Sequence, residues 1–233
     1  MSGSTIDFDF LALPKRRTPY ESPRNHRKQS RARHLVHAVV APWTEISGTG
    51  IGARMRHSDA KEVDILAAYR VNEVVRNMRQ FRGNPHATMR VCLADMFDAE
   101  LNAMYRRKYV DRTAQELRER LVDSLRMVLI GDEQPQEVQK IRINNDELVI
   151  EELADRPSAS YNVYLTRQRI TFSDYRIDSV AWIAPLDMKR AKGPSPYAWA
   201  ISRDRHPELF DYYLQQEFED VIRDARRVYP RNG

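Results

Sequence analysis

The stretch that decides the fold class is residues 141–150, IRINNDELVI, where the spacing of apolar side chains changes. Ile141 and Ile143 recur two residues apart, as do Leu148 and Ile150, and this is the period of a β-strand. The Asn-Asn-Asp between the two halves has the composition of a tight turn, so the stretch predicts a hairpin. Because the chain before it shows helical spacing and the chain after it shows further strands, we expect an α+β fold.

Two long helices are expected upstream of the hairpin, between the prolines that interrupt the chain. The first covers residues 59–80, where Asp59 and Glu62 match a capping-box pattern and apolar residues recur at spacings of three and four. The second covers about 87–108, with apolar residues at similar spacings. Both are predicted to present an apolar stripe to a common core.

A third helix has the clearest start and stop signals of the upstream region. Thr113 and Glu116 form a second capping-box pattern, and Gly131 follows the last apolar residue in the position that favours a helix C-terminus. The three helices together predict a helical layer over about residues 58–131.

A small, mostly antiparallel sheet is expected over about residues 138–202. Its strands are the hairpin and the runs near Tyr161–Leu165, Ile170–Phe172, Val180–Ile183 and Tyr197–Ile201. A β-branched run that starts at His34 and stops at Pro42 is a further strand, buried or at the edge of a sheet.

A long C-terminal helix is expected over residues 207–229, with Pro207 at its first position and Pro230 just past its end. Its apolar residues are spaced three and four apart in one stripe: Phe210, Leu214, Phe218, Val221, Ala225 and Val228. An apolar stripe of this length is expected to pack against another apolar surface. The chain's own sheet is the preferred surface, and a partner helix or a second copy of the protein is the alternative.

Charge divides the chain into residues 1–33 and a single globular domain, residues 34–233. The net charge is +5, from 38 basic and 33 acidic side chains. Residues 1–33 hold three acids and eight cations, which are Lys15, Arg16, Arg17, Arg24, Arg27, Lys28, Arg31 and Arg33, so the domain has 30 of each. The whole excess of positive charge therefore lies in the N-terminal segment.

Within that segment, residues 14–33 form what we call the basic arm. The arm contains three prolines, eight cations and one acid, and it has almost no aliphatic side chain to bury. Such a composition does not offset the entropy lost on ordering, so we expect a flexible arm. Flexible Lys and Arg side chains suit sequence-independent contact with nucleic-acid phosphates. A solvated tail or a targeting address is the alternative.

Two further sets of residues are candidate binding sites. Arg167 and Arg169 are candidate phosphate contacts, since together with Arg176 they surround three aromatic residues on which bases could stack, namely Tyr164, Phe172 and Tyr175. Ordinary strand alternation explains that pattern equally well. Ahead of the arm, Ile6, Phe8 and Phe10 alternate with acids, which is typical of a short peptide that binds a partner protein. Folding of this peptide onto the chain's own surface is the alternative.

No residue pattern in the chain indicates an active site, a metal site or a cofactor. Cys92 is the single cysteine, so no intrachain disulfide forms, and its place in a helical pattern suggests burial. The residue types that catalysis uses are present, but no spacing brings them together: His34, His37, His57, His86, His206, Asp59, Glu62, Asp95 and Asp98. We therefore expect that the protein is not an enzyme and holds no cofactor.

The preferred function is a non-enzymatic, nucleic-acid-associated structural or assembly protein, attached to DNA or RNA through the basic arm. Its globular body would contact other protein subunits or form a homo-oligomer. One alternative is a protein–protein adaptor that uses the N-terminal peptide and the C-terminal helix, and a second is a nuclease or other hydrolase. The longest uncharged apolar stretch, His34–Trp43, is too short to span a membrane, so a cytoplasmic or nucleoprotein location and no membrane partner are expected.

Overall fold

The structure is a computed structural model that describes much of the chain from Val39 onward. The described residues are 39–42, 60–69, 71, 79–109, 111–131, 137–153, 159–186 and 197–230. Residues Val40–Gly233 form one compact unit. The expected basic arm and the N-terminal peptide lie outside the described residues.

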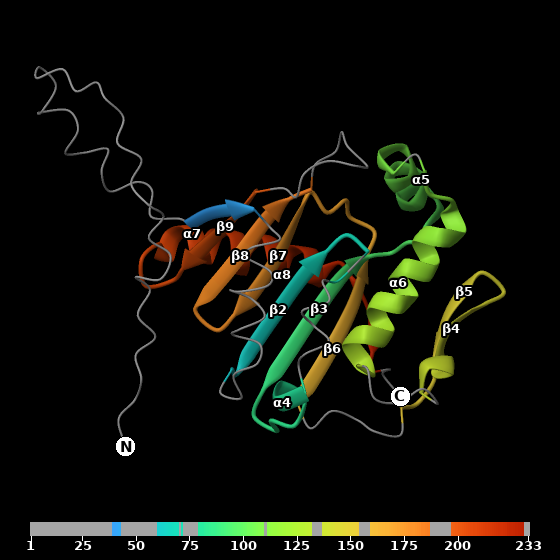
Figure 1. Cartoon of the computed structure of the whole chain (residues 1–233), viewed down its shortest axis with the longest axis horizontal. Helices are drawn as coiled ribbons and strands as arrows, with labels where there is room; N and C mark the ends of the chain where they lie inside the picture. The colour runs from blue at the N-terminus through green and yellow to red at the C-terminus, as the bar shows by residue number, and fades with distance from the viewer. Residues whose placement is uncertain are drawn as a thin grey trace, which may run out of the picture. The chain divides into compact units, whose positions relative to one another are not determined.

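One large mixed sheet forms the centre of this unit. Its strands are β1 (Val39–Pro42), β2 (Glu62–Ala67), β3 (Thr88–Ala94), β6 (Ser160–Thr166), β7 (Phe172–Ile177), β8 (Val180–Pro185), β9 (Tyr197–Ser202) and β10 (Arg226–Tyr229). The eight strands lie in the order β1-β9-β8-β7-β2-β3-β6-β10 (Figure 1). The central strands β2, β3 and β6 are parallel, whereas β7, β8, β9 and β10 join by antiparallel pairing.

The described helices are short apart from one. They are α4 (Arg79–Arg82), α5 (Ala99–Lys108), α6 (Ala114–Leu129), a 3-10 turn η4 (Val138–Lys140), α7 (Pro207–Asp211), a π-helical segment η5 (Tyr212–Glu217) and α8 (Phe218–Arg223). Among these, no helix has the length and apolarity needed to cross a membrane.

The helices cover opposite faces of the sheet. In Figure 1, α6 lies in front of the strands, and α7 and α8 lie behind them. Side chains alternate between the two faces along a strand. Asp64 of β2 faces α8, so its neighbours Val63 and Ile65 face α6. On that side the core is apolar, and Leu117, Leu121 and their neighbours on α6 are buried in it.

The third expected helix is confirmed as α6. The Thr113 hydroxyl accepts a hydrogen bond from the Glu116 amide at 3.1 Å, and the Glu116 carboxylate accepts one from the Thr113 amide at 2.7 Å. Gly131 follows the helix at φ +74°, where a side chain would be strained. The capping box therefore located the start of this helix, and Gly131 located its end.

The hairpin and the later strands are also confirmed. The strands β4 (Ile141–Asn144) and β5 (Glu147–Ile150) pair outside the main sheet, and the turn residues Asn145 and Asp146 have positive φ. Asn and Asp tolerate this conformation better than most residues. The expected strands near Tyr161–Leu165, Val180–Ile183 and Tyr197–Ile201 correspond to β6, β8 and β9, whereas the expected run Ile170–Phe172 shares only Phe172 with β7, and all four strands are part of the large sheet.

The expected three-helix layer and small antiparallel sheet are wrong, because the fold is mixed α/β around a large sheet. Within the range 59–80 the chain forms strand β2 and the short α4 among its described residues, and Glu62 begins β2 instead of capping a helix. The range 87–108 divides into strand β3 and helix α5. Both strands are central and nearly continuously buried, so their apolar residues do not alternate with polar ones and the pattern resembles that of a helix.

The expected single C-terminal helix over 207–229 is also wrong. The helical chain passes through the π-helical segment η5, stops at Arg223, and returns as the strand β10 alongside β6. Docking on the chain's own sheet is confirmed for two residues of the stripe. Phe210 packs on β8 and β9, and Phe218 is fully buried in the main core.

Candidate functional site

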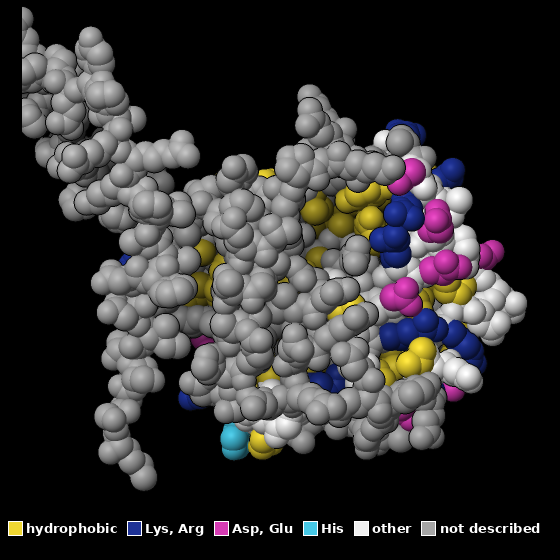
Figure 2. Space-filling view, viewed as in Figure 1, with side chains coloured by type: hydrophobic (Ala, Val, Ile, Leu, Met, Phe, Trp, Pro, Cys, Tyr) yellow, Lys and Arg dark blue, Asp and Glu magenta, His cyan; other side chains and the backbone are white. Residues whose placement is uncertain are grey.

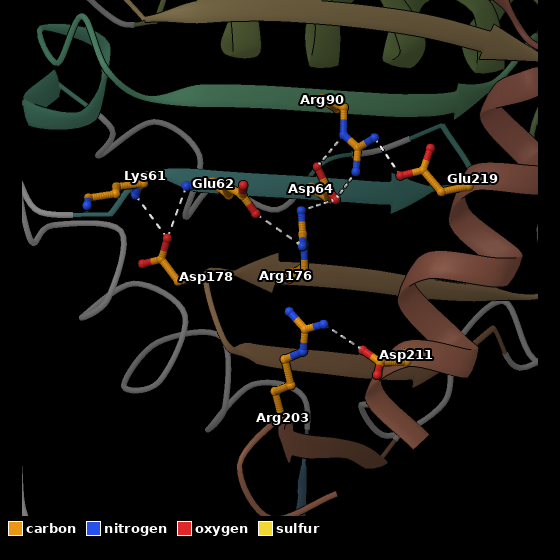
Figure 3. Close-up of polar contacts among 9 residues, drawn as sticks. All are labelled: Lys61, Glu62, Asp64, Arg90, Arg176, Asp178, Arg203, Asp211 and Glu219. Atoms are coloured by element: carbon orange, nitrogen blue, oxygen red, sulfur yellow. Dashed lines mark hydrogen bonds and ion pairs between the residues drawn. The ribbon is translucent and has the colours of Figure 1, made fainter. Parts of the chain in front are cut away.

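A cluster of charged side chains lies between the sheet and the C-terminal helical segment. It consists of Asp64, Arg90, Asp174, Arg176 and Glu219, which we call the charged cluster (Figure 3 shows all of these except Asp174). These residues come from β2, β3, β7 and α8. Charged groups are rarely buried unless they are paired, which makes the cluster the most unusual feature of the described residues.

Strand register brings the cluster together. Asp64 lies directly opposite Arg90 in the parallel β2–β3 pair and directly opposite Arg176 in the antiparallel β2–β7 pair. Residues opposite each other point to the same face of a sheet, so both guanidinium groups reach the one carboxylate. Asp174, two residues before Arg176 on β7, points to the same face.

Asp64 is the centre of the ion pairs. Its two carboxylate oxygens accept from Arg90 Nε at 2.8 Å and Nη2 at 2.6 Å, which is a bidentate contact. Arg176 Nη2 lies 2.5 Å from Asp64 Oδ2, and Arg176 Nη1 lies 3.3 Å from Glu62 Oε2. The Asp64 side chain is only 3% exposed, so its contacts with Arg90 and Arg176 are shielded from water, whereas the Glu62 side chain is 60% exposed.

Arg90 links the sheet to the C-terminal helical segment. Its Nη1 donates to Glu219 Oε1 of α8 at 2.6 Å, and its guanidinium lies over the Phe218 ring, 5.0 Å from the centroid. The hydrogen bond to Asp64, and secondarily Glu219, raises the pKa of Arg90 above its ordinary value. One side chain therefore ties α8 to both β2 and β3.

Asp174 differs from the other members because it lacks a counter-charge of its own. It is fully buried, and neither carboxyl oxygen has a hydrogen-bond partner among the described residues. Burial raises the pKa of Asp174 well above its ordinary value, and the nearby charge of Asp64 raises it further, against a smaller lowering by Arg176. Burial also raises the pKa of Glu217, at the end of η5.

A second set of charged side chains lies just after the carboxyl ends of β3 and β6. Arg226 Nη2 lies 3.2 Å from Asp95 Oδ2, and Arg167 Nε lies 3.5 Å from Asp98 Oδ2. Asp98 also caps α5, since its carboxylate accepts from the Leu101 amide at 2.9 Å. Both acids therefore have structural partners in this part of the fold.

Of the expected nucleic-acid contacts, only Arg167 and Arg169 lie within the described residues. Both are exposed, in the loop after β6. The aromatic surface expected beside them is not assembled, because Tyr175 is only 2% exposed and Arg176 belongs to the charged cluster. The cations of the basic arm and the peptide residues Ile6, Phe8 and Phe10 lie outside the described residues.

The candidate catalytic residues are dispersed where the structure describes them. His86 is exposed in the turn before β3, and His206 precedes α7 at the far end of the fold. Cys92 lies fully buried in β3, as expected for a packed thiol, and burial raises its pKa to about 12. Among the described residues no group of three or more His, Cys, Asp or Glu side chains could hold a metal ion. His34, His37, His57 and Asp59 lie outside them.

Sequence reasoning did not find the charged cluster, although one signal was available. Asp64 and Arg90 each stand alone inside an apolar run, Val-Asp-Ile-Leu-Ala and Met-Arg-Val-Cys-Leu. A single charged residue between apolar neighbours in a buried strand indicates a buried side chain with an ion-pair partner, in preference to a side chain exposed to water. The arrangement contacts α8 through Arg90 and Glu219, and its chemistry is ion pairing.

Comparisons with known proteins add little to this geometry. No protein-family model and no curated protein sequence matches the chain. One weakly similar solved structure is that of TrmBL2, described as an archaeal chromatin protein with a novel mode of DNA binding. The two structures superpose with a TM-score of 0.42 and 10% sequence identity. The match covers 82% of this chain and about half (54%) of the TrmBL2 chain. A likeness at this TM-score shows neither a shared family nor a shared function.

Proposed function

We propose that the protein is a non-enzymatic, nucleic-acid-associated structural or assembly protein that attaches to the phosphate backbone of DNA or RNA through its basic arm. The observation that carries the proposal is the distribution of charge. Eight cations lie in residues 14–33, whereas residues 34–233 hold equal numbers of basic and acidic side chains. A cationic, proline-containing segment attached to a neutral body suits backbone attachment without sequence readout.

The structure of the body supports this division of roles. Many of its arginines form ion pairs within the body: Arg112 with Glu116, Arg118 with Asp146, Arg126 with Asp123, Arg142 with Glu151, and Arg223 with Asp220. In Figure 2, basic and acidic side chains are interspersed over the region of α5 and α6. An arginine that already neutralises a carboxylate adds little attraction for a phosphate, which leaves the arm as the main source of attraction.

The size of the expected effect follows from the arm's charge. Each phosphate that the protein neutralises contributes about −0.7 to −0.9 to the slope of log affinity against log salt concentration. If all eight cations of the arm contact phosphates, the slope reaches about −6 to −7. Partial engagement gives a proportionally smaller slope.

The test compares binding of a labelled oligonucleotide by the natural protein and its variants, using fluorescence anisotropy at about 50 mM salt, where such contacts are strong. Replacing the eight cations of the arm with Gln should abolish most of the affinity. Arg167→Gln with Arg169→Gln should remove only the contribution of the body. Deleting residues 1–13, which contain two acids and no cation, is the matched control and should leave binding intact. Equal affinity of the Gln-substituted arm and the natural protein contradicts the proposal.

A protein–protein adaptor is the second candidate, and one structural observation favours it. Trp199, Leu209 and Tyr212 are the large apolar side chains most exposed among the described residues, at 39%, 39% and 52%. They lie on β9, α7 and η5, and α7 packs against β9. An adaptor would keep its protein partner after the arm is neutralised and would lose it on Trp199→Ser with Leu209→Ser.

A further inference from the structure

Asp174 is a fully buried carboxyl group beneath the C-terminal helical segment. It lies on the face of β7 that carries Arg176, and its neighbour across β8, Ile183, packs against Phe210 of α7. Neither of its oxygens makes a hydrogen bond of good geometry among the described residues, and the backbone amide of Tyr175 is the smallest influence on the pKa of Asp174. A carboxylate in such a place is strongly disfavoured unless it is neutralised.

The charged groups around Asp174 do not neutralise it. Its electrostatic neighbours are Asp64 on β2, Arg176 on β7 and Glu217 on η5, and the cluster continues to Arg90 on β3 and Glu219 on α8. Both arginines are already bound to Asp64, and each has a second acid, Glu219 for Arg90 and Glu62 for Arg176. Acids outnumber cations in this layer, and the smallest cation that could restore the balance is a proton.

We propose that a proton on Asp174 holds the C-terminal segment, residues 207–230, against the sheet, and that loss of this proton loosens the segment. In the closed state Asp174 is a neutral carboxylic acid under α7 and η5. When the O–H bond breaks, the proton passes to water or a buffer base and the electron pair stays on the carboxylate. The carboxylate then gains hydration only if the helical layer above it opens.

The segment is suited to opening independently of the rest. Its polar contacts with the rest lie at the surface, such as Arg90 with Glu219 at 2.6 Å and Gln168 with Asp224 at 3.1 Å, its strand β10 is a short edge strand, and Phe210 and Phe218 are the large side chains that it buries. Elements at the edge of a fold open at lower free energy than the core. The apolar core on the opposite face, beneath α6, does not depend on Asp174.

The direction of the pH dependence follows from proton linkage. The pKa of Asp174 is raised in the folded state, so the closed state binds more protons than the open state in which the carboxyl group meets water. The closed state is therefore most favoured below the ordinary carboxyl pKa. The preference for the closed state weakens as the pH rises from the ordinary carboxyl pKa to the raised pKa of Asp174, and it changes no further above the raised pKa. Between these two pKa values, release of one proton changes the opening equilibrium about tenfold per pH unit.

The experiment is hydrogen–deuterium exchange of the full chain from about pH 5 to about pH 9, corrected for intrinsic exchange rates. Protection of residues 207–223 should fall with rising pH relative to protection of α6. Asp174→Asn, which mimics the neutral acid, should remove this dependence. Asp220→Asn, an exposed acid on α8, is the matched control and should keep it. A pH-independent ratio in the natural protein, or the same dependence in Asp174→Asn, overturns the proposal.

A direct titration covers the case in which Asp174→Asn does not fold. The ¹³C chemical shift of the Asp174 carboxyl group in the natural protein should report a neutral acid well above the ordinary carboxyl range. An Asp174 carboxyl group that titrates with the exposed acids, such as Asp220, contradicts the proposal. A raised pKa of Asp174 without any pH-dependent change in the protection of residues 207–223 also contradicts the proposal, because the proton would then not control the segment.

Discussion

Replacing Asp64 with Asn tests whether the charged cluster holds the two layers together. Asp64 accepts two hydrogen bonds from Arg90, at 2.8 and 2.6 Å, and pairs with Arg176 at 2.5 Å, with a side chain only 3% exposed. Asn keeps the size of the side chain but removes its charge. Two partly buried guanidinium groups are then left without their shared counter-charge.

The expected loss is large because the pairs are shielded from solvent. Removing one partner of a buried ion pair costs about 3–5 kcal/mol, a large part of the roughly 5–15 kcal/mol by which domains are stable. The free energy of unfolding is measured by urea denaturation. Glu219→Gln is the matched control, since Glu219 contacts the same Arg90 at 2.6 Å but is 43% exposed, and it should cost less than about 1 kcal/mol.

A compensating variant separates charge from packing. Asp64→Leu combined with Arg90→Met and Arg176→Met removes the three central charges. It should regain most of the stability lost in Asp64→Asn because the acids that lose their partners, Glu62 and Glu219, are 60% and 43% exposed. Asp64→Asn with a free energy of unfolding within about 1 kcal/mol of the natural protein would refute this account of the cluster, since a shielded pair of this geometry cannot be lost so cheaply.

Two further substitutions test the packing of the helices. Phe218→Ala should lower the free energy of unfolding by about 3–5 kcal/mol in urea denaturation, because Phe218 is fully buried. Leu209→Ala is the control, and at 39% exposure it should change that free energy by no more than about 0.5–1 kcal/mol. If Phe218→Ala lowers the assembled mass without lowering monomer stability, Phe218 serves an interface instead of the core. Thr113→Ala should cost about 1 kcal/mol by removing the capping box of α6, whereas Gln115→Ala on the same exposed turn should be nearly neutral, and equal effects of the two would contradict the cap.

Local signals in the sequence located the elements whose structure depends on near neighbours. The capping box at Thr113 and the positive-φ turn at Asn145 and Asp146 are set within a few residues, and the corresponding helix and hairpin were predicted correctly. The strands β6, β8 and β9 were predicted from apolar runs in a region of two-residue spacing, whereas only the first residue of β7, Phe172, was included. These successes rest on contacts that the local sequence itself specifies.

The central strands were mistaken for helices for a physical reason. A parallel strand covered on both faces is apolar on both, so β2 and β3 lack the alternation that identifies an exposed strand. At six or seven residues such a run also fits a helical spacing. The sheet was therefore predicted to be too small, and the fold class was wrong.

The C-terminal prediction failed at the point where tertiary pairing overrides helical pattern. Val228 continues the spacing of the apolar stripe, but it is buried as part of β10, which pairs with β6. For the charged cluster, the sequence pattern marks Asp64 and Arg90 as single charges inside apolar runs but does not identify their partners. Asp64 and Arg176 are more than a hundred residues apart in sequence, and only the register of β2 with β7 brings them together.

The most direct test of the proposed function is the salt dependence of nucleic-acid binding by the full chain. The association constant for single-stranded and double-stranded oligonucleotides of several sequences is measured between about 50 and 200 mM salt. The proposed arm-mediated attachment predicts a steep log–log slope, approaching about −6 to −7 if every cation of the arm is engaged, that varies little with sequence. No binding at about 50 mM salt, or a shallow slope with strong dependence on sequence, would contradict attachment through the basic arm.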